Sequence, residues 1–470
     1  MNMETNQWRT KMEIVKENEL GTKSIGKLLF NMSLPAIIAQ IVNVLYNMVD
    51  RMYIGHIPGI GADALTGIGV TMPLIMIISA FAALVSMGGA PRASIMLGKK
   101  NKEAAEKILG NCTAALVLVA IILTAVVLLY GEKMLMLFGA SDNTIGYALD
   151  YMRIYAIGTI FVQLSLGLNA FITAQGFAKT SMLTVTIGAI ANIILDPILI
   201  FGFNMGVKGA ALATIISQAI SAIWVVLFLR GNKSLLTIKK KYLKIELKTF
   251  LPCIALGLSP FIMQSTESIL IIAFNTSLQK YGGDLAVGAM TILSSVMQFS
   301  MLPLMGLTQG AQPIISYNYG AENSSRVKHT FILVLKSAFG YSTLLWALAM
   351  LFPQLFARIF TSDAQLIEVT ISALRIYMAA SLLLGIQVSC QQTFIALGNA
   401  KASVFLAILR KIILLIPLIF LLPLFMENKV SAVYLAEPIA DFLAVTVTTI
   451  MFVSQFRKVL RELSANGETK

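Results

Sequence analysis

Residues 191–203 read ANIILDPILIFGF, and this stretch decides what kind of protein the chain is. Twelve of the thirteen residues suit a lipid or core environment, whereas Asp196 does not. Pro197 follows it, and its ring removes a backbone donor and disturbs the preceding helical turn. An apolar run of this kind is typical of a membrane helix, and an acid inside such a helix is a candidate for a functional role.

The rest of the chain is similarly apolar. Of its 470 residues, 57% are hydrophobic and 13% are charged, and the mean hydropathy is +0.80. A soluble domain has about a quarter of its residues charged. We therefore predict an all-α, polytopic membrane protein, because backbone groups in lipid must be bonded within their own helix. Twelve spans are expected, near 28–54, 66–90, 111–130, 149–173, 183–203, 209–229, 251–277, 286–311, 329–352, 370–396, 403–425 and 432–455.

The loop charges predict the orientation of these spans. On the side of the two termini, the arm, loops and tail hold 25 Lys and Arg residues, and the opposite loops hold six. Basic loops stay in the cytoplasm, so both termini are expected there. The net charge of +13 is explained by this bias, and no nucleic-acid partner is expected. The charged N-terminal stretch has no apolar core of a cleaved signal peptide.

The chain also repeats itself at an offset of 222 residues. The matches include Gly88 with Gly310, Pro91 with Pro313, Gly98 with Gly320, Arg153-Ile154-Tyr155 with Arg375-Ile376-Tyr377, and Lys179 with Lys401. Two halves of six spans each have the same orientation, so we expect a pseudo-two-fold axis along the membrane normal and a substrate bound between the lobes. The expected parts are a cytoplasmic arm (1–27), an N-lobe (28–229), a basic cytoplasmic linker (230–248), a C-lobe (249–456) and a cytoplasmic tail (457–470).

Several kinds of chemistry are not expected. The pattern GxxxxGK[ST] does not occur, so the chain is not expected to hydrolyse ATP, and we predict no enzyme activity. The three cysteines, Cys112, Cys253 and Cys390, are too few and too scattered for a disulfide or metal framework. With two histidines in the chain, no metal site of several histidines and no cofactor is expected.

The sequence contains four distinctive motifs, VDRMYIG (49–55), AQGFAKTSM (174–182), NIILDPILIFGF (192–203) and GLTQGAQPIISYNYGAEN (306–323). They resemble motifs of the multidrug and toxic compound extrusion (MATE) family, and most of all its DinF-type bacterial branch. The resemblance covers residues 25 to 455. It implies a two-lobed antiporter in the inner (plasma) membrane that exports lipophilic, often cationic drugs and other xenobiotics in exchange for H⁺ or Na⁺, with a role in antibiotic resistance. We expect it to act as a monomer in the lipid bilayer.

Two alternatives remain at this point. A flippase for a lipid-linked oligosaccharide shares the two-lobed plan, but such flippases usually carry more cations in the cavity to hold a pyrophosphate. A major-facilitator transporter usually has GxLADRxGRRxx between its second and third helices. Here that loop reads PRASIMLGKKNKEAAEK.

A polar cluster is expected in the outer part of the N-lobe. At about 1.5 Å per helical residue, Asp50 lies roughly 6 Å, Thr214 about 8 Å and Asp196 about 10 Å below the outer surface. Asn192 lies one turn from Asp196 on the same face. These oxygens suit one shared proton or a Na⁺ ion, or they form a structural cluster between helices. The resemblance places Asp50, Asn192, Asp196 and Thr214 where the DinF-type branch keeps its cation site.

A second acidic site is less well defined. Glu267, near the middle of the seventh span, resembles the acid of the C-lobe site in NorM-type members. Those members pair it with an acid on the tenth span, and here that span has none. Asp441 on the twelfth span could replace that partner, or it could meet Glu267 through water.

Further polar and thioether side chains face the expected cavity or pack between helices. Flexible thioethers suit a binding site for varied apolar ligands, and amides can bond a ligand or join two helices. The candidates for substrate contact are Gln40, Asn43, Asn47, Asn169, Met263, Gln264, Met297, Gln298 and Met301.

Overall fold

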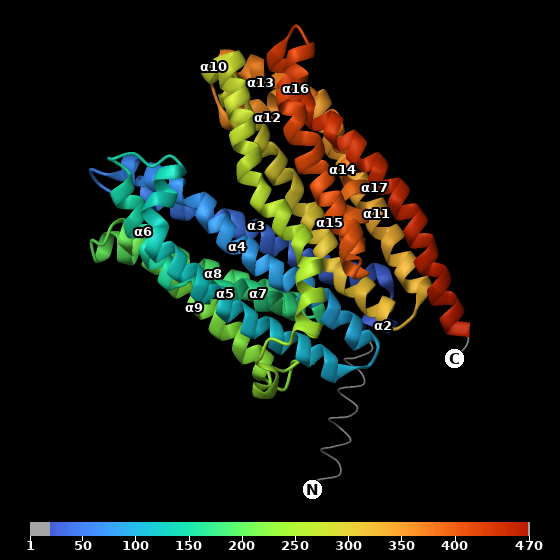
Figure 1. Ribbon diagram of the computed structural model, residues 1–470. Helices are drawn as coiled ribbons and strands as arrows, with labels where there is room; N and C mark the ends of the chain where they lie inside the picture. Colours follow the sequence, from blue (N-terminus) through green and yellow to red (C-terminus); the bar gives the residue numbers. More distant parts are fainter. Residues whose placement is uncertain (1–18, 469–470) are drawn as a thin grey trace.

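The computed structural model describes residues 19–468, and side chains up to residue 465 (Figure 1). The expected arm therefore lies mostly outside the described residues. Among these, every regular element is helical. The first part comprises α2 (Glu19–Thr22), α3 (Ile25–Gly55), α4 (Gly61–Gly98), α5 (Lys102–Leu137), α6 (Ile145–Ile157), α7 (Thr159–Ala174), α8 (Ala178–Pro197), η1 (Ile198–Gly202) and α9 (Val207–Arg230). The second part comprises η2 (Lys240–Tyr242), α10 (Leu247–Gly320), α11 (Ser324–Leu351), α12 (Pro353–Phe360), α13 (Ala364–Tyr377), η3 (Ser381–Leu383), α14 (Leu384–Ala396), α15 (Ala400–Ile408), η4 (Leu409–Leu415), α16 (Ile416–Phe425) and α17 (Lys429–Glu468).

The helices confirm a membrane protein. Within residues 19–468, nine helices are long and apolar enough to cross a bilayer, and two bent pairs raise this number to eleven. The helix α10 consists of two helices that meet at Gly283, where φ is 62° and ψ is −160°. Only glycine adopts such a backbone readily. If α10 crosses the membrane twice, the number of spans is the predicted twelve, and that number stays a prediction.

The helices extend beyond the predicted apolar runs. The span expected at 66–90 belongs to a helix that ends at Gly98, and the span expected at 111–130 belongs to one that begins at Lys102. The two helices are separated by residues 99–101, and the side chain of Asn101 accepts a hydrogen bond from the backbone N–H of Ala104. Such a cap satisfies a free backbone donor at the helix start. Polar turns therefore continue the helices outside the apolar layer.

The two halves of the molecule are arranged as a V. We call α3–α9 the N-terminal half and α10–α17 the C-terminal half. They converge at the end where α2 and the C-terminal end of α17 lie, here called the closed end (Figure 1). They diverge toward the opposite end, where α6, α12 and α13 lie, here called the open end (Figure 1). Two halves that meet at one end and diverge at the other suit the alternating access that a transporter needs.

Reciprocal glycine contacts hold the halves together near the closed end. A Cβ atom on Gly98 would lie 2.0 Å from the carbonyl oxygen of Tyr317, and a Cβ atom on Gly320 would lie 2.0 Å from that of Ile95. Gly98 and Gly320 are one of the pairs at the 222-residue offset, and so are Ile95 and Tyr317. Gly98 contacts the counterpart of Ile95, and Gly320, the counterpart of Gly98, contacts Ile95. Such reciprocal contacts indicate that the halves are related by a two-fold axis.

A similar pair of close contacts lies deeper between the halves. A Cβ atom on Gly257 would lie 1.7 Å from the carbonyl oxygen of Leu84, and one on Gly306 would lie 2.6 Å from the backbone nitrogen of Ile37. Leu84 and Gly306 are again 222 residues apart, whereas Ile37 and Gly257 are 220 apart, so the two contacts correspond to within two residues. These crossings support the predicted pseudo-symmetry. They also show that helix backbones of the two halves touch where only hydrogen fits, which is how glycine serves membrane-helix packing.

The connection between the halves is docked on the N-terminal half. Gln175 Oε1 accepts hydrogen bonds from Ser234 Oγ and from the backbone N–H groups of Leu235 and Leu236, at 2.7 to 2.9 Å. Glu246 lies 2.5 Å from Lys107 Nζ and 2.8 Å from Lys244 Nζ. The basic linker is therefore an ordered surface element of the closed end.

Candidate functional site

Two carboxyl groups meet inside the N-terminal half. Asp50 lies near the end of α3 and Asp196 near the end of α8, and their side chains lie within hydrogen-bonding reach of each other. Asp50 is 8% exposed and Asp196 is fully buried. Asn192 Nδ2 donates a hydrogen bond to Asp196 Oδ1 at 3.3 Å. The helices α3 and α8 pack along each other, and this packing brings together two acids that are far apart in sequence.

Three oxygen atoms of this cluster have no hydrogen-bond donor among the described residues. They are Asp50 Oδ1, Asp196 Oδ2 and Asn192 Oδ1. Two ionised carboxylates offer only acceptors, so they repel each other unless a proton or a metal cation lies between them. Oxygen ligands from carboxylate and amide groups are those that hard cations prefer. The cluster can therefore hold one proton or one small cation.

The backbone beside Asp196 is irregular, as Pro197 predicts. The α-helix ends at Pro197 and continues as the π-helical turn η1. Proline has no N–H group, so the carbonyl of Ile193 receives no hydrogen bond from position 197. Single π-helical turns within helices occur frequently at functional sites. The wide turn therefore places Asp196 beside a backbone in which not every carbonyl group accepts a hydrogen bond within the helix.

Thr214 completes the predicted set from α9. Its Oγ1 donates a hydrogen bond to the carbonyl of Ala210 at 3.0 Å and lies within hydrogen-bonding reach of the Tyr151 hydroxyl. The ring of Tyr151 stacks on that of Tyr155, with 6.0 Å between centroids. The structure thus brings Asp50, Asn192 and Asp196 together. It places Thr214 on the neighbouring helix α9, beside Tyr151 and Tyr155, which were not among the predicted site residues.

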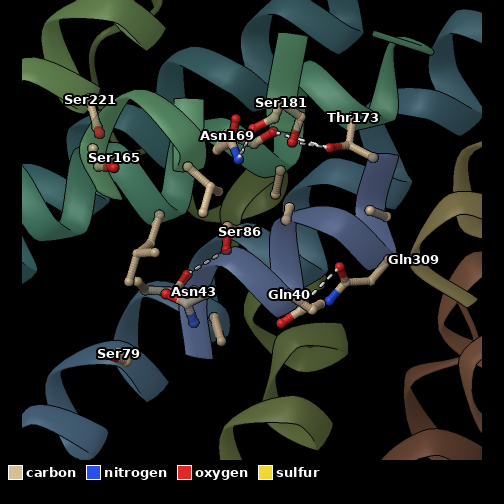
Figure 2. A pocket seen from close by; sticks show the side chains of 18 of the residues that line it. Gln40, Asn43, Ser79, Ser86, Ser165, Asn169, Thr173, Ser181, Ser221 and Gln309 are labelled. Atoms are coloured by element: carbon tan, nitrogen blue, oxygen red, sulfur yellow. Dashed lines mark hydrogen bonds between the residues drawn. The ribbon is translucent and has the colours of Figure 1, made fainter. Parts of the chain in front are cut away.

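A cavity of about 450 Å³ lies beside this cluster. Asn192, Thr214, Tyr46 and Tyr155 belong to its wall, so the cavity reaches the residues next to the acids. Its wall comes mainly from the N-terminal half, and α10 adds further residues. Figure 2 shows amides and hydroxyls from several helices converging on this space. The wall contains no charged side chain among the residues that the structure describes.

Five of the predicted substrate contacts line the cavity. They are Gln40, Asn43, Asn47, Asn169 and Gln264. Three of them are tied to neighbours. Gln40 Nε2 donates to Gln309 Oε1 at 3.1 Å, and Asn169 Nδ2 donates to the carbonyl of Ser181 at 3.2 Å (Figure 2). Asn47 Nδ2 donates to the carbonyl of Asn43 at 2.6 Å. The Oδ1 atom of Asn169 is buried without a donor among the described residues. It remains available to a ligand that can donate a hydrogen bond.

The other four predicted contacts lie outside this cavity wall. Met297 and Met301 pack against the cluster of Leu304, Ala338 and Leu384 in the C-terminal half. Met263 accepts a hydrogen bond from Gln391 Nε2 at its sulfur, over 3.2 Å. Gln298 is exposed on α10. The thioethers of Met263, Met297 and Met301 thus contact other side chains of the protein. Helical spacing alone does not distinguish such packing from contact with a ligand.

The acids of the C-terminal half are paired with cations, which corrects the expected Glu267–Asp441 partnership. Glu267 forms its ion pair with Lys411. Asp441 lies 2.6 Å from Arg410 Nε, and Glu437 lies 3.1 Å from Arg410 Nη2. The physical reason is that Arg410 and Lys411 are themselves buried in the half and need counter-charges. The two predicted acids thus belong to one network of five charged groups, but each has its own cation.

Sequence reasoning missed Arg410 and Lys411 as site residues, although a signal for them was present. A basic residue in the middle of an apolar span requires a partner. The partners lie on α10 and α17, which are distant in sequence, so the pairing follows only from the folded arrangement. Tyr46, one turn before Asp50, and Gln309 on α10 could have been found by the same argument about polar groups inside spans.

The comparisons with known proteins agree on a family. The MatE family model matches residues 35–198 and 260–421. The multidrug export protein MepA of Staphylococcus haemolyticus is 27% identical over 426 residues, covering 90% of this chain and 93% of that protein. MepA of Staphylococcus aureus is 26% identical over 398 residues, with 85% of this chain and 87% of that protein covered.

Solved structures show the same fold. A crystal structure of a MATE protein in the bent conformation superposes with a TM-score of 0.89 at 21% identity, covering 95% of this chain and 99% of that one. An outward-facing multidrug resistance transporter of the MATE family superposes with a TM-score of 0.85 at 22% identity, covering 93% of this chain and 97% of that one. The all-helical fold expected from the sequence is thereby confirmed.

Proposed function

Since the chain belongs to the MatE family, we propose that it is a secondary active antiporter that exports lipophilic, often cationic drugs in exchange for H⁺ or Na⁺. The observation that carries this proposal is the buried pair of Asp50 and Asp196 beside a polar cavity between helices. The names of the two staphylococcal relatives, which are multidrug export proteins, support export of several compounds. The resemblance to solved MATE structures supports the fold alone.

The coupling ion would bind at Asp50, Asn192 and Asp196. Their free oxygen atoms suit a proton shared by two carboxylates, and they also suit Na⁺ with added carbonyl or water oxygens. Thr214 and Asn192 connect this cluster to the cavity wall, because both contribute to the wall. Ion and drug must favour different states of the protein, since a ligand with equal affinity for both states shifts nothing.

The open end would face away from the cytoplasm. The basic linker and the C-terminal end of α17 lie at the closed end, and the loop charges predict that this end is cytoplasmic. The structure would then represent an outward-open state, in which the entering ion binds and the drug leaves. An entering cation gains about 2.3 kcal/mol per 100 mV of membrane potential, which supplies driving force for export.

A flippase for a lipid-linked oligosaccharide is the second candidate. The uncharged cavity wall argues against it, because a pyrophosphate would require cationic side chains there. The two functions are distinguished in the same proteoliposomes. An antiporter should move protons or Na⁺ when a drug is added, with the two gradients imposed separately, whereas a flippase should expose the lipid-linked oligosaccharide on the opposite leaflet.

Drug-stimulated ion flux is the deciding measurement. We expect a fluorescent lipophilic cation to leave cells or accumulate in inverted vesicles only when the Na⁺ or the pH gradient is present. Flux that is independent of both gradients would contradict the antiport. Vesicles without protein and vesicles with the Asp196→Asn variant are the controls.

A further inference from the structure

The charged network of the C-terminal half has two unequal parts. Arg410 is shared by Glu437 and Asp441 on α17, and all three side chains are at most 17% exposed. Lys411 serves Glu267 on α10, and here the two partners differ greatly in exposure. The Lys411 side chain is 9% exposed, whereas that of Glu267 is 50% exposed. Glu267 is therefore the acid of this network that open space can reach.

Glu267 borders the space between the halves. It follows Gln264, which lines the central cavity, by three residues on the same helix. Its neighbour Ser268 donates a hydrogen bond across the interface to the sulfur of Met76 on α4, at 3.7 Å. Residues three and four apart share a helix face, so Glu267 stands one turn beyond the cavity wall toward the open end. Asp50 and Asp196, in contrast, are buried behind the wall.

Lys411 is held against Glu267 from inside the half. Its ammonium group also donates a hydrogen bond to the carbonyl of Met263 at 2.9 Å. Arg410 and Lys411 are consecutive residues in the π-helical segment η4, whose wide turn allows both side chains to face the interior and reach different acids. The ammonium thus reaches the carboxylate along the protein interior, and it leaves the other side of Glu267 exposed.

We propose that Glu267 is a binding residue for the positive charge of a hydrophobic monovalent cation, and that Lys411 is a tethered competitor for it in this open state. The inference rests on the proposed export of cations. One carboxylate offers one negative charge, so an ammonium already bound weakens its attraction for a second cation. Export requires weak binding in the state that releases the drug, and Lys411 supplies that weakening for charged substrates alone.

The test compares a cation with a neutral molecule of similar shape. The probes are tetraphenylphosphonium and triphenylphosphine oxide, and their dissociation constants are measured on the purified full chain. Lys411→Met should tighten tetraphenylphosphonium binding at least about tenfold, which corresponds to one close charge pair. It should leave triphenylphosphine oxide unchanged and slow the efflux of tetraphenylphosphonium from proteoliposomes. Lys411→Arg keeps the competing charge and should bind both probes as the wild type does.

Two further variants make the result decisive. In Lys411→Met with Glu267→Gln, the gain in cation binding should disappear, because the carboxylate is gone. Glu267→Gln alone should slow efflux of the cation and not of the neutral probe. If Lys411→Met does not fold, Glu267→Gln alone serves as the test. We expect Lys411→Met to fold, because Glu267 is exposed enough to be hydrated once its partner is removed.

The contrary results are equally clear. Unchanged tetraphenylphosphonium binding by folded Lys411→Met would overturn the proposal, and so would equal tightening for both probes, which would indicate a loosened cavity. Efflux of the cation by Glu267→Gln at the wild-type rate would also overturn it. Failure of the proposed function would look different, because the wild type itself would then show no gradient-driven efflux of either probe.

Discussion

At the scale of single residues, the proposed ion coupling depends on the pair of Asp50 and Asp196. Both could be predicted from the sequence, because an acid within an apolar span is costly and is rarely kept without a function. Asn192 followed from helical spacing, and the structure places it on Asp196. The charged network of the C-terminal half could not be predicted in the same way. Its partners are 144 residues apart in one pair, and no spacing rule connects residues at that distance.

Replacement of Asp196 by Asn removes the titratable charge and keeps the size of the side chain. The variant should still insert and fold, because a neutral amide is less costly in the membrane than a carboxylate. It should bind drug but lose gradient-driven efflux. The measurement is efflux of a fluorescent lipophilic cation per folded molecule. Asp150→Asn is the matched control, since Asp150 is an exposed acid that lies 3.5 Å from Lys208. Wild-type efflux from Asp196→Asn would end the ion-site hypothesis for this residue.

Asp50→Asn tests whether the two acids hold one ion together. If they do, the single variant should resemble Asp196→Asn, and the double variant should be no worse than either. Residues that act as a unit give non-additive effects. Efflux that falls further in the double variant would instead indicate two separate sites. The same flux assay and the same quantity of folded protein serve for all three variants.

At the scale of elements, apolar runs predicted where helices cross the membrane, but their ends and bends were not predicted. The pair α6 and α7 is bent by 58° and the pair α13 and α14 by 48°. Neither bend follows from hydropathy, because the breaks, at Gly158 and at residues 378–380, contain no charged residue and no proline. The turn at η1 was predictable from Pro197, and η4 likewise ends two residues before Pro417 of its own span. Tertiary packing therefore sets the two bends, whereas prolines accompany the two π-helical turns.

Gly257→Ala tests the close crossing of α10 and α4. The added methyl group would lie 1.7 Å from the carbonyl oxygen of Leu84, so the helices must separate. Overpacking of this kind typically costs about 1–3 kcal/mol. We expect a lower unfolding temperature in detergent. Gly69→Ala on α4 is the control, because a Cβ atom there meets nothing within 4 Å. Equal stability of the two variants would show that the crossing yields without cost.

Acidification should loosen the linker from α5. Lys107, and then Lys244, hold the pKa of Glu246 below its usual range. A carboxyl group with a lowered pKa stabilises the docked state above its unfolded pKa, and this stabilisation is lost as the pH falls through the docked pKa. A spin label at position 240 should therefore become more mobile below about pH 4. Glu246→Gln should show that mobility already at neutral pH. A linker equally rigid in both conditions would contradict the role of this carboxylate.

At the scale of the whole molecule, the repeat and the loop charges predicted the arrangement of two halves and its orientation. The V shape was not predicted, because one sequence must serve both the open and the closed positions of the halves. The orientation can be checked with single cysteines at Lys240 and Lys280, in a background without Cys112, Cys253 and Cys390. An impermeant maleimide should label position 280 in intact cells, and position 240 only after the membrane is opened. Labelling of position 240 in intact cells would reverse the topology.

The glycine contacts of Gly98 and Gly320 also have an electrical consequence. Where a backbone carbonyl occupies the place of a side chain, no water molecule fits between the two helices at that contact, so a file of waters that could carry protons is interrupted there. Larger side chains at these positions would hold the closed end ajar while the open end stays open. The membrane would then conduct, and about 2.3 kcal/mol per elementary charge and 100 mV would be dissipated as heat. Tight glycine packing at the closed end thus suits the proposed antiporter, because a leak there would dissipate the gradient without moving cargo.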